Sequence, residues 1–151
     1  MKLAAVFLLF VSCFFNEDRY KTDAVQEPTF ELILQEQTGG PAKPQMMVVK
    51  GEKSLKDFYI QINKTRRPGL PVPEINFKEE KVIILCMGSR TTGGYSIEIE
   101  KLEEKADLIN IYVREKGSPS KYSTSVLTEP FSIYKIKAAD KKLVFKKADQ
   151  R

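Results

Sequence analysis

The amino-acid sequence predicts a mainly β protein. It favours an antiparallel β-sandwich or curled sheet of about seven or eight short strands with one amphipathic helix, and an α+β fold is the alternative. Residues 82–87 form an uninterrupted apolar run, as in a strand that is buried on both faces. Apolar and polar residues alternate over 95–99 and over 109–114, as in strands with one buried face. Residues 55–62 carry apolar side chains at helical spacing.

Two strands and the helix are expected in the first part of the domain. Residues 30–35 have apolar side chains at alternate positions, and the Thr-Gly-Gly-Pro segment at 38–41 ends this strand. Met46–Val49 is expected to return beside it. Ser54 and Asp57 match a capping box, in which the serine and the acid cap free backbone N–H groups at a helix start. The apolar stripe of this helix, which should pack on the sheet, comprises Leu55, Phe58, Tyr59 and Ile62.

The middle of the chain contains a long break and the buried strand. Residues 64–76 include three prolines, so they should cross over as a stiff loop rather than form a central strand or helix. Gly88 then ends the apolar run. The glycine-rich segment at 88–94 is most simply a tight hairpin turn. It leads into a strand over 95–99, which runs on to Leu102.

The last third of the chain contributes further short strands. A turn is expected at 103–107 and a half-buried strand at 109–113, before a second exposed loop at 117–120. The lysines on both sides of the final apolar segment should be solvated and protect a sheet edge. The remaining strands are predicted over 122–127, 131–136 and 143–145.

The first 12 residues have the form of a secretory leader, with a positive start and an apolar stretch too short to span a bilayer. Phe10-Val11-Ser12-Cys13 resembles a bacterial lipobox, in which the cysteine becomes the lipidated first residue of the mature protein. An ordinary cleaved leader with an incidental cysteine is the alternative. The sequence thus predicts a signal peptide over 1–12, a membrane anchor of acyl chains such as palmitate on Cys13, a polar tether over 13–28 and one domain over 29–148.

Composition argues against several classes of function. The formal net charge is +5, but the basic residues are spread along the chain, so nucleic-acid binding is not expected. The chain has no histidine, which removes the commonest general base and metal ligand. Cys86 lies inside the apolar run and should be an inert buried thiol. Because no metal-ligand spacing is present either, the sequence predicts a non-enzyme without cofactor or metal.

Three motifs in a fixed order carry a family resemblance. FKEEK at 77–81 precedes the apolar run, TTGGYSI at 91–97 follows it, and LTEPFSI lies at 127–133. This arrangement resembles the PrcB C-terminal domain family, most strongly over residues 74–146. The resemblance implies a non-catalytic accessory subunit of a surface or periplasmic protease complex. Together with the lipobox and the acidic Glu17-Asp18 pair, the resemblance implies an outer-membrane lipoprotein of a Gram-negative bacterium. The side of the membrane that the protein faces is left open.

The glycine-rich segment is the candidate partner-binding loop. It is also similar to the Asn-Pro-Thr-Thr-Gly-Tyr loop of chagasin-type inhibitors, which implies a cysteine-peptidase inhibitor as an alternative. A third alternative is an envelope lipoprotein with a structural or ligand-binding role. As a partner-binding loop, the segment has two glycines that set the turn, threonines that hydrogen-bond a partner or cap the turn internally, and an arginine that pairs with a carboxylate. The tyrosine has an alternative role as a core aromatic. The loop residues are Arg90, Thr91, Thr92, Gly93, Gly94 and Tyr95.

Overall fold

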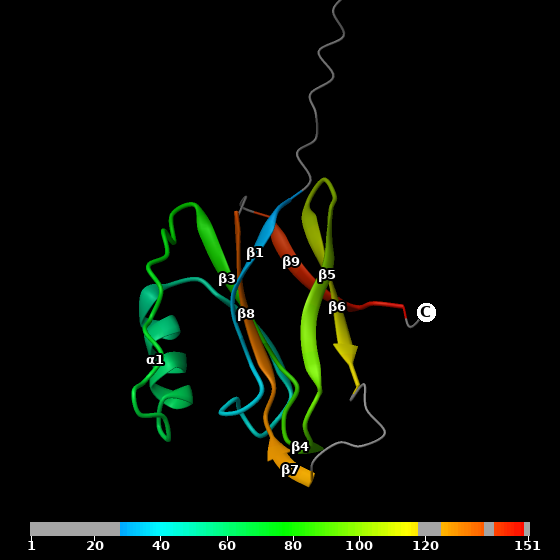
Figure 1. The fold of residues 1–151 in the computed structure, drawn as a ribbon. Coiled ribbons are helices and arrows are strands. Elements are labelled where there is room, and N and C mark those ends of the chain that lie inside the picture. Colours follow the sequence, from blue (N-terminus) through cyan, green and yellow to red (C-terminus); the bar gives the residue numbers. More distant parts are fainter. Residues whose placement is uncertain (1–27, 118–124, 138–140, 150–151) are drawn as a thin grey trace, which may run out of the picture.

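The computed structural model of the chain describes residues 28–117, 125–137 and 141–149 (Figure 1). The predicted leader, Cys13, nearly all of the tether and residues 118–124 lie outside the described part. The described elements are β1 (Phe30–Glu36), β2 (Gln45–Val49), α1 (Glu52–Ile62), β3 (Glu80–Cys86), β4 (Arg90–Thr92), β5 (Ser96–Glu104), β6 (Leu108–Lys116), β7 (Ser125–Thr128), β8 (Phe131–Lys137) and β9 (Lys142–Lys147). The predicted mainly β class is confirmed.

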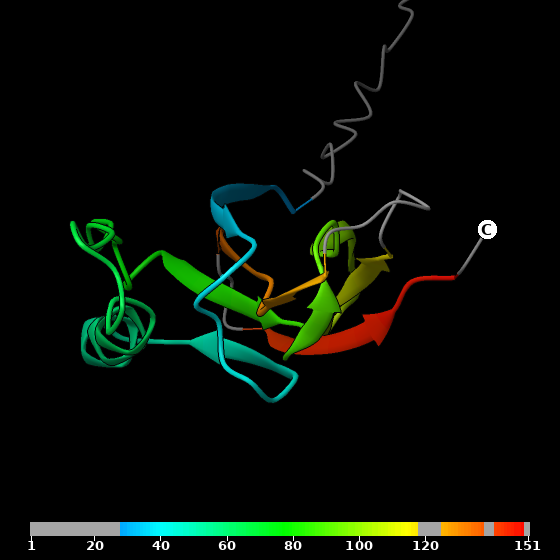
Figure 2. The same cartoon turned by 60° about the horizontal axis from the view of Figure 1, so that its bottom comes forward.

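Two sheets pack face to face, and α1 covers the outer face of one of them (Figures 1 and 2). The sheet next to α1 has the strand order β1-β8-β3-β2, with antiparallel pairs throughout. The second sheet has the order β5-β6-β9, in which β5 and β6 are antiparallel and β9 runs parallel to β6. The short strands β4 and β7 pair only with each other among the described strands. The molecule is therefore a sandwich with a helix on one outer face.

The apolar run predicted to be buried on both faces is the centre of the fold. Every side chain from Val82 to Met87 is at most 2% exposed. Because side chains alternate along a strand, this run contributes to two cores. The members that join the core against α1 are Val82, Ile84 and Cys86, and those that join the core against the second sheet are Ile83, Leu85 and Met87.

The predicted amphipathic helix is confirmed, but its predicted cap is not. Its four stripe residues are all buried and pack on the first sheet. The helix begins at Glu52 after an extended Gly51, and no side chain caps it, so the capping box at Ser54 is wrong. Ser54 lies within the first turn, where its backbone is already helical and cannot serve as the extended N-cap residue. Ion pairing of Lys56 with Glu52 (2.6 Å) supports that turn instead.

The strands predicted over 30–35 and 46–49 both form, each one residue longer, but they are not neighbours. β1 pairs with β8 and β2 pairs with β3, so β1 and β2 lie at opposite edges of the sheet. The register of β1 shifts between Leu32 and Leu34, and this bulge inserts an extra residue that breaks the alternation. Leu32 is 47% exposed as a result, whereas Ile33 and Leu34 both pack against the core under α1.

The predicted hairpin between β3 and β5 is wrong. β3 is already flanked by β8 and β2, so no side of it is open to β5, and the chain crosses to the second sheet through β4.

The alternation of polar and apolar residues in β6 has one exception, because Asn110 is only 1% exposed. Its amide donates to Glu103 Oε2 (3.2 Å), which also accepts the Tyr112 hydroxyl (2.7 Å). These two bonds, the Tyr112 bond first, hold the pKa of Glu103 below its usual value.

Candidate protein-binding site

β4 and β7 form a two-stranded ribbon at one end of the sandwich (lower end of Figure 1). Arg90 pairs with Thr128 and Thr92 pairs with Ser125, with an irregular register between them. The Thr128 hydroxyl, which is buried, donates to the Thr92 carbonyl (2.9 Å). The glycine-rich segment expected as a loop is therefore a strand over 90–92, and only the residues after Thr92 form a turn into β5.

The loop between β1 and β2 is hydrogen-bonded to the root of this ribbon, which is the end where Ser89, Tyr95 and Glu129 join it to the sandwich. The Ser89 N–H donates to the Ala42 carbonyl (3.0 Å), and the Gln37 Nε2 donates to the Tyr95 carbonyl (2.9 Å). On the other strand, the Glu129 N–H donates to the Gln37 carbonyl (3.0 Å). Ser89 and Tyr95 flank β4 and Glu129 follows β7, so one loop is bonded to the ends of both strands. The ribbon thus has a fixed position on the sandwich.

Glycine is required at two positions of this segment, and they differ in part from the predicted pair. Gly88 has φ +74° and Gly94 has φ +84°, a region that glycine adopts without steric cost. Gly93 does not have a positive φ, and a Cβ there would meet only Val126 Cγ1, at 3.9 Å. The turn is therefore set by Gly94, as predicted, and by Gly88, whereas no conformational requirement for glycine is found at Gly93.

Arg90 lies across the base of the ribbon. Its guanidinium carbon is 5.8 Å from the centre of the Tyr95 ring, and its Nη1 donates to the Ser89 carbonyl (3.1 Å). Its Nη2 is 3.9 Å from Glu115 Oε2, a long ion pair in which the two side chains are 28% and 38% exposed. Such a pair contributes at most about 1 kcal/mol to stability, so the Arg90 side chain can leave Glu115 at little cost in free energy. Tyr95 is partly buried and packs against the core between the two sheets, which confirms its core role.

The ribbon also exposes apolar side chains that were not singled out from the sequence. Val126 is 47% exposed and Leu127 is 66% exposed. Adjacent residues of a strand point to opposite faces, so both faces of the ribbon present an apolar group. Thr91 on β4 is exposed beside them. The sequence does contain a pattern that indicates this exposure. All four residues two positions before or after Val126 and Leu127 are Ser, Thr or Glu, so neither apolar residue has an apolar neighbour on its own face of the strand.

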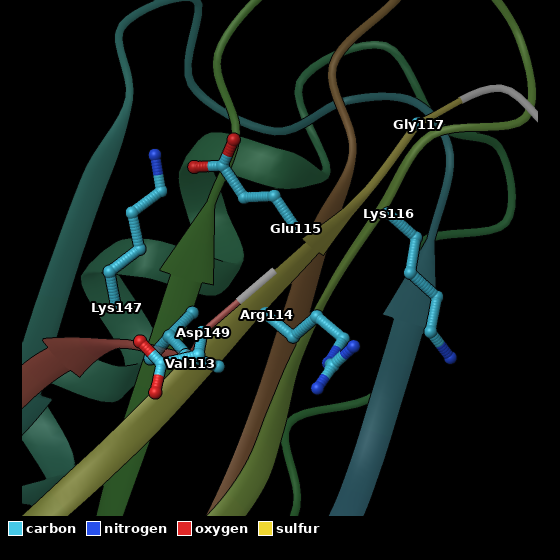
Figure 3. Close-up of a pocket in the computed structure, with 8 residues that line it drawn as sticks. Val113, Arg114, Glu115, Lys116, Gly117, Lys147 and Asp149 are labelled. Carbon is cyan, nitrogen blue, oxygen red and sulfur yellow. The ribbon is translucent and has the colours of Figure 1, made fainter. Parts of the chain in front are cut away.

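A hollow of about 360 Å³ lies where the end of β6 meets the segment after β9 (Figure 3). Figure 3 shows Arg114 and Lys116 extending to one side of β6, and Glu115 and Lys147 extending to the other. The lining carries no hydroxyl or thiol nucleophile. Within the described residues, no three His, Cys, Asp or Glu side chains are grouped so that they could hold a metal ion.

Cys86 is the described thiol, and it is buried at the end of β3 with 1% exposure. Burial raises its pKa to about 12, because the thiolate would lose its hydration. The thiolate is the nucleophilic form, so Cys86 is inert at neutral pH, as predicted. No described helix is long and apolar enough to cross a membrane.

Comparison with known proteins gives one match. Residues 81–137, from β3 to the end of β8, match the family described as PrcB C-terminal. No curated protein and no solved structure matches the chain significantly. The matched segment includes the central buried strand and both strands of the ribbon, together with the TTGGYSI and LTEPFSI motifs, whereas FKEEK precedes it except for Lys81. Over residues 81–137 this chain is therefore similar to the PrcB C-terminal family.

Proposed function

We propose that this protein is a non-catalytic, lipid-anchored binding module and the accessory subunit of a cell-envelope protease complex. Its match to the PrcB C-terminal family over residues 81–137 supports a role beside a protease. The observation that carries the proposal is the ribbon of β4 and β7, which exposes Leu127 and Val126 on its two faces. We assign the ribbon as the contact with the partner.

A ribbon of this kind suits binding for two physical reasons. Its root is hydrogen-bonded to the loop between β1 and β2, so little backbone freedom is lost when a partner docks. Its exposed Leu127 and Val126 side chains gain favourable free energy when a partner removes them from water. Arg90 adds a charged donor beside them, since a partner carboxylate can replace its weak interaction with Glu115.

The ribbon hypothesis predicts a selective loss of partner on changing Leu127. Leu127→Ser should weaken binding by about tenfold or more, because truncating a central apolar contact typically costs 1–2 kcal/mol or more. The measurement is recovery of crosslinked partners from cell envelopes, identified by mass spectrometry, with the full chain carrying its own leader. Ile60→Ser is the matched control, because Ile60 on α1 is also 66% exposed.

Both variants should keep the melting temperature of the parent, since neither side chain lies in a core. Loss of a peptidase with Leu127→Ser and its retention with Ile60→Ser supports the proposal. Equal recovery by both variants would remove the ribbon as the contact.

Changing Arg90, Thr91 and Thr92 together to alanine tests β4 of the same ribbon. If a papain-type peptidase is inhibited by the parent and not by this triple variant, the inhibitor alternative replaces the accessory role.

The anchoring part of the proposal concerns residues outside the described structure. Acylated Cys13 would hold the protein at the outer membrane of a Gram-negative envelope, on whichever side the complex assembles. The tether from Cys13 to Pro28 has 16 residues, so it reaches at most roughly 55 Å when extended. The domain would therefore work close to the membrane surface.

Lipidation predicts that Cys13→Ser moves the protein from the membrane fraction to the soluble fraction and abolishes incorporation of labelled palmitate. The physical reason is that acyl chains supply the attachment and a serine cannot carry the thioether-linked lipid. Cys86→Ala is the control and should stay in the membrane fraction, because it leaves Cys13 in place. Membrane retention and labelling of Cys13→Ser would contradict the anchor.

A further inference from the structure

β2 is an unusual edge strand. Four strands lie at the edges of the two packed sheets within the described structure, namely β1, β2, β5 and β9. Charged side chains occur in β1, β5 and β9, and β1 has a bulge as well, which are common devices against unwanted pairing. The five residues of β2, QMMVV, carry no charge, no proline and no bulge. None of the described strands pairs with its outer side.

The backbone of β2 presents hydrogen-bonding groups on that open side. Directly after β3, the Met87 N–H donates to the Pro130 carbonyl on the β8 side (2.9 Å). Because successive residues of a strand direct these groups to opposite sides, Cys86 faces β2 and its register partner Gln45 faces β3. By the same alternation, Met46 and Val48 direct their N–H and C=O groups outward. An added strand would find two residues ready to pair.

A side-chain hollow lies next to this edge. It has a volume of about 310 Å³ and lies between β2 and the second sheet. Figure 2 shows β2 and β9 along the same lower side of the molecule. A residue placed opposite Met46 in an added strand shares the face of Met46, so its side chain would enter this hollow. The lining residues are Met46, Val113, Glu115, Phe145, Lys146 and Lys147.

The charge around the edge decides between two kinds of occupant. Exposed Lys43 and Lys50 lie just beyond the two ends of β2, and Lys147 borders the hollow. No ion pair joins these three lysines to other residues of the described structure. Glu115 in the lining faces Arg90 at 3.9 Å. Antiparallel pairing of two β2 strands from two copies would place Lys43 of one near Lys50 of the other. This repulsion disfavours a second copy and favours an acidic partner.

We propose that β2 is a β-augmentation site for an extended acidic peptide segment of another protein, which adds as a fifth strand to the sheet. Backbone bonds to Met46 and Val48 give the affinity, and one apolar side chain in the hollow gives the register. Acidic residues at the two ends of the segment pair with Lys43 and Lys50. This site is separate from the ribbon and does not depend on the proposed function.

The test uses a fluorescein-labelled probe peptide, Glu-Val-Leu-Val-Glu, titrated into the full chain in detergent with anisotropy as the readout and detergent alone as the blank. Two further peptides carry N-methyl groups on backbone nitrogens. The first is methylated at the leucine, and the second is methylated at both valines. Alternate N–H groups of an added strand face β2 while the others face solvent. One methylated peptide should therefore lose at least about tenfold in affinity and the other should bind like the parent, since one or two backbone bonds are removed.

Charge and protein variants complete the experiment. The peptide Lys-Val-Leu-Val-Lys should bind at least about tenfold more weakly, and added salt should weaken the acidic peptide. Val48→Pro should weaken binding, because it removes an outward N–H and leaves the pairing with β3 intact. Lys50→Glu is a second variant at an exposed position that should also weaken binding. Leu127→Ser should bind the peptide like the parent, which separates this site from the ribbon.

Four results would overturn the proposal, and the first three concern the peptides. They are no binding of the acidic peptide at about 1 mM, equal binding of both methylated peptides and the parent, and equal binding of the lysine peptide. Sedimentation provides a fourth. A concentration-dependent dimer that Val48→Pro abolishes would assign this edge to a second copy of the chain.

Discussion

Replacing Gly88 with alanine is expected to lower the free energy of unfolding by about 3 kcal/mol or more, which corresponds to a fall of on the order of 10 °C in melting temperature. Gly88 has φ +74°, where a residue with a Cβ is strained. The added Cβ would also lie 2.7 Å from Pro44 Cδ and 2.8 Å from the Ala42 carbonyl oxygen. Backbone would have to shift where the ribbon meets the loop between β1 and β2.

Gly93→Ala is the matched control for this prediction. It changes a glycine of the same segment, but φ is not positive there and the closest contact is ordinary van der Waals contact at 3.9 Å. We expect its melting temperature to stay within a degree or two of the parent. Thermal unfolding followed by circular dichroism measures both. If the two variants melt together, the strain assigned to Gly88 is absent.

Phe131→Ala is expected to destabilise the protein by about 3–5 kcal/mol, as for other fully buried aromatic residues. Phe131 is 1% exposed, and its ring meets the Phe58 ring of α1 edge-on with 5.9 Å between centroids. It is also the first residue of β8, directly after the segment that returns from the ribbon. Its loss would leave a cavity between α1 and the sheet at the root of the binding site.

Chemical denaturation measures this effect, with Ile60→Ala as the control on the solvent side of α1. Ile60 is 66% exposed, so its truncation should cost no more than about 0.5 kcal/mol. A loss of less than about 1 kcal/mol for Phe131→Ala would mean that the helix is not firmly packed on the sheet. Urea is suitable because the slope of the transition reports whether the native state has loosened.

Part of the candidate site could be predicted from residue types alone. The requirement for glycine at position 94, the core packing of Tyr95 and the inert character of Cys86 all follow from local chemistry and periodicity. The assignment of a similar conformational role to Gly93 does not hold, because φ depends on how the chain must turn between β4 and β5. The apolar surface of β7 was also missed, since exposure depends on what covers a strand, and nothing in the described structure covers Leu127.

Local pattern therefore determined the helix, the strand buried on both faces and most of the half-buried strands, but not β4, which was expected as part of a loop. The apolar run at β3 and the stripe on α1 needed no knowledge of their neighbours, because burial on one or both faces is recorded directly in residue spacing. Pairing was decided only by the tertiary structure. β4 pairs with β7 across the whole β5–β6 hairpin, and β2 pairs with β3 across α1 and the proline-rich loop. The physical reason is that a strand's partner is set by which edges the rest of the chain leaves open.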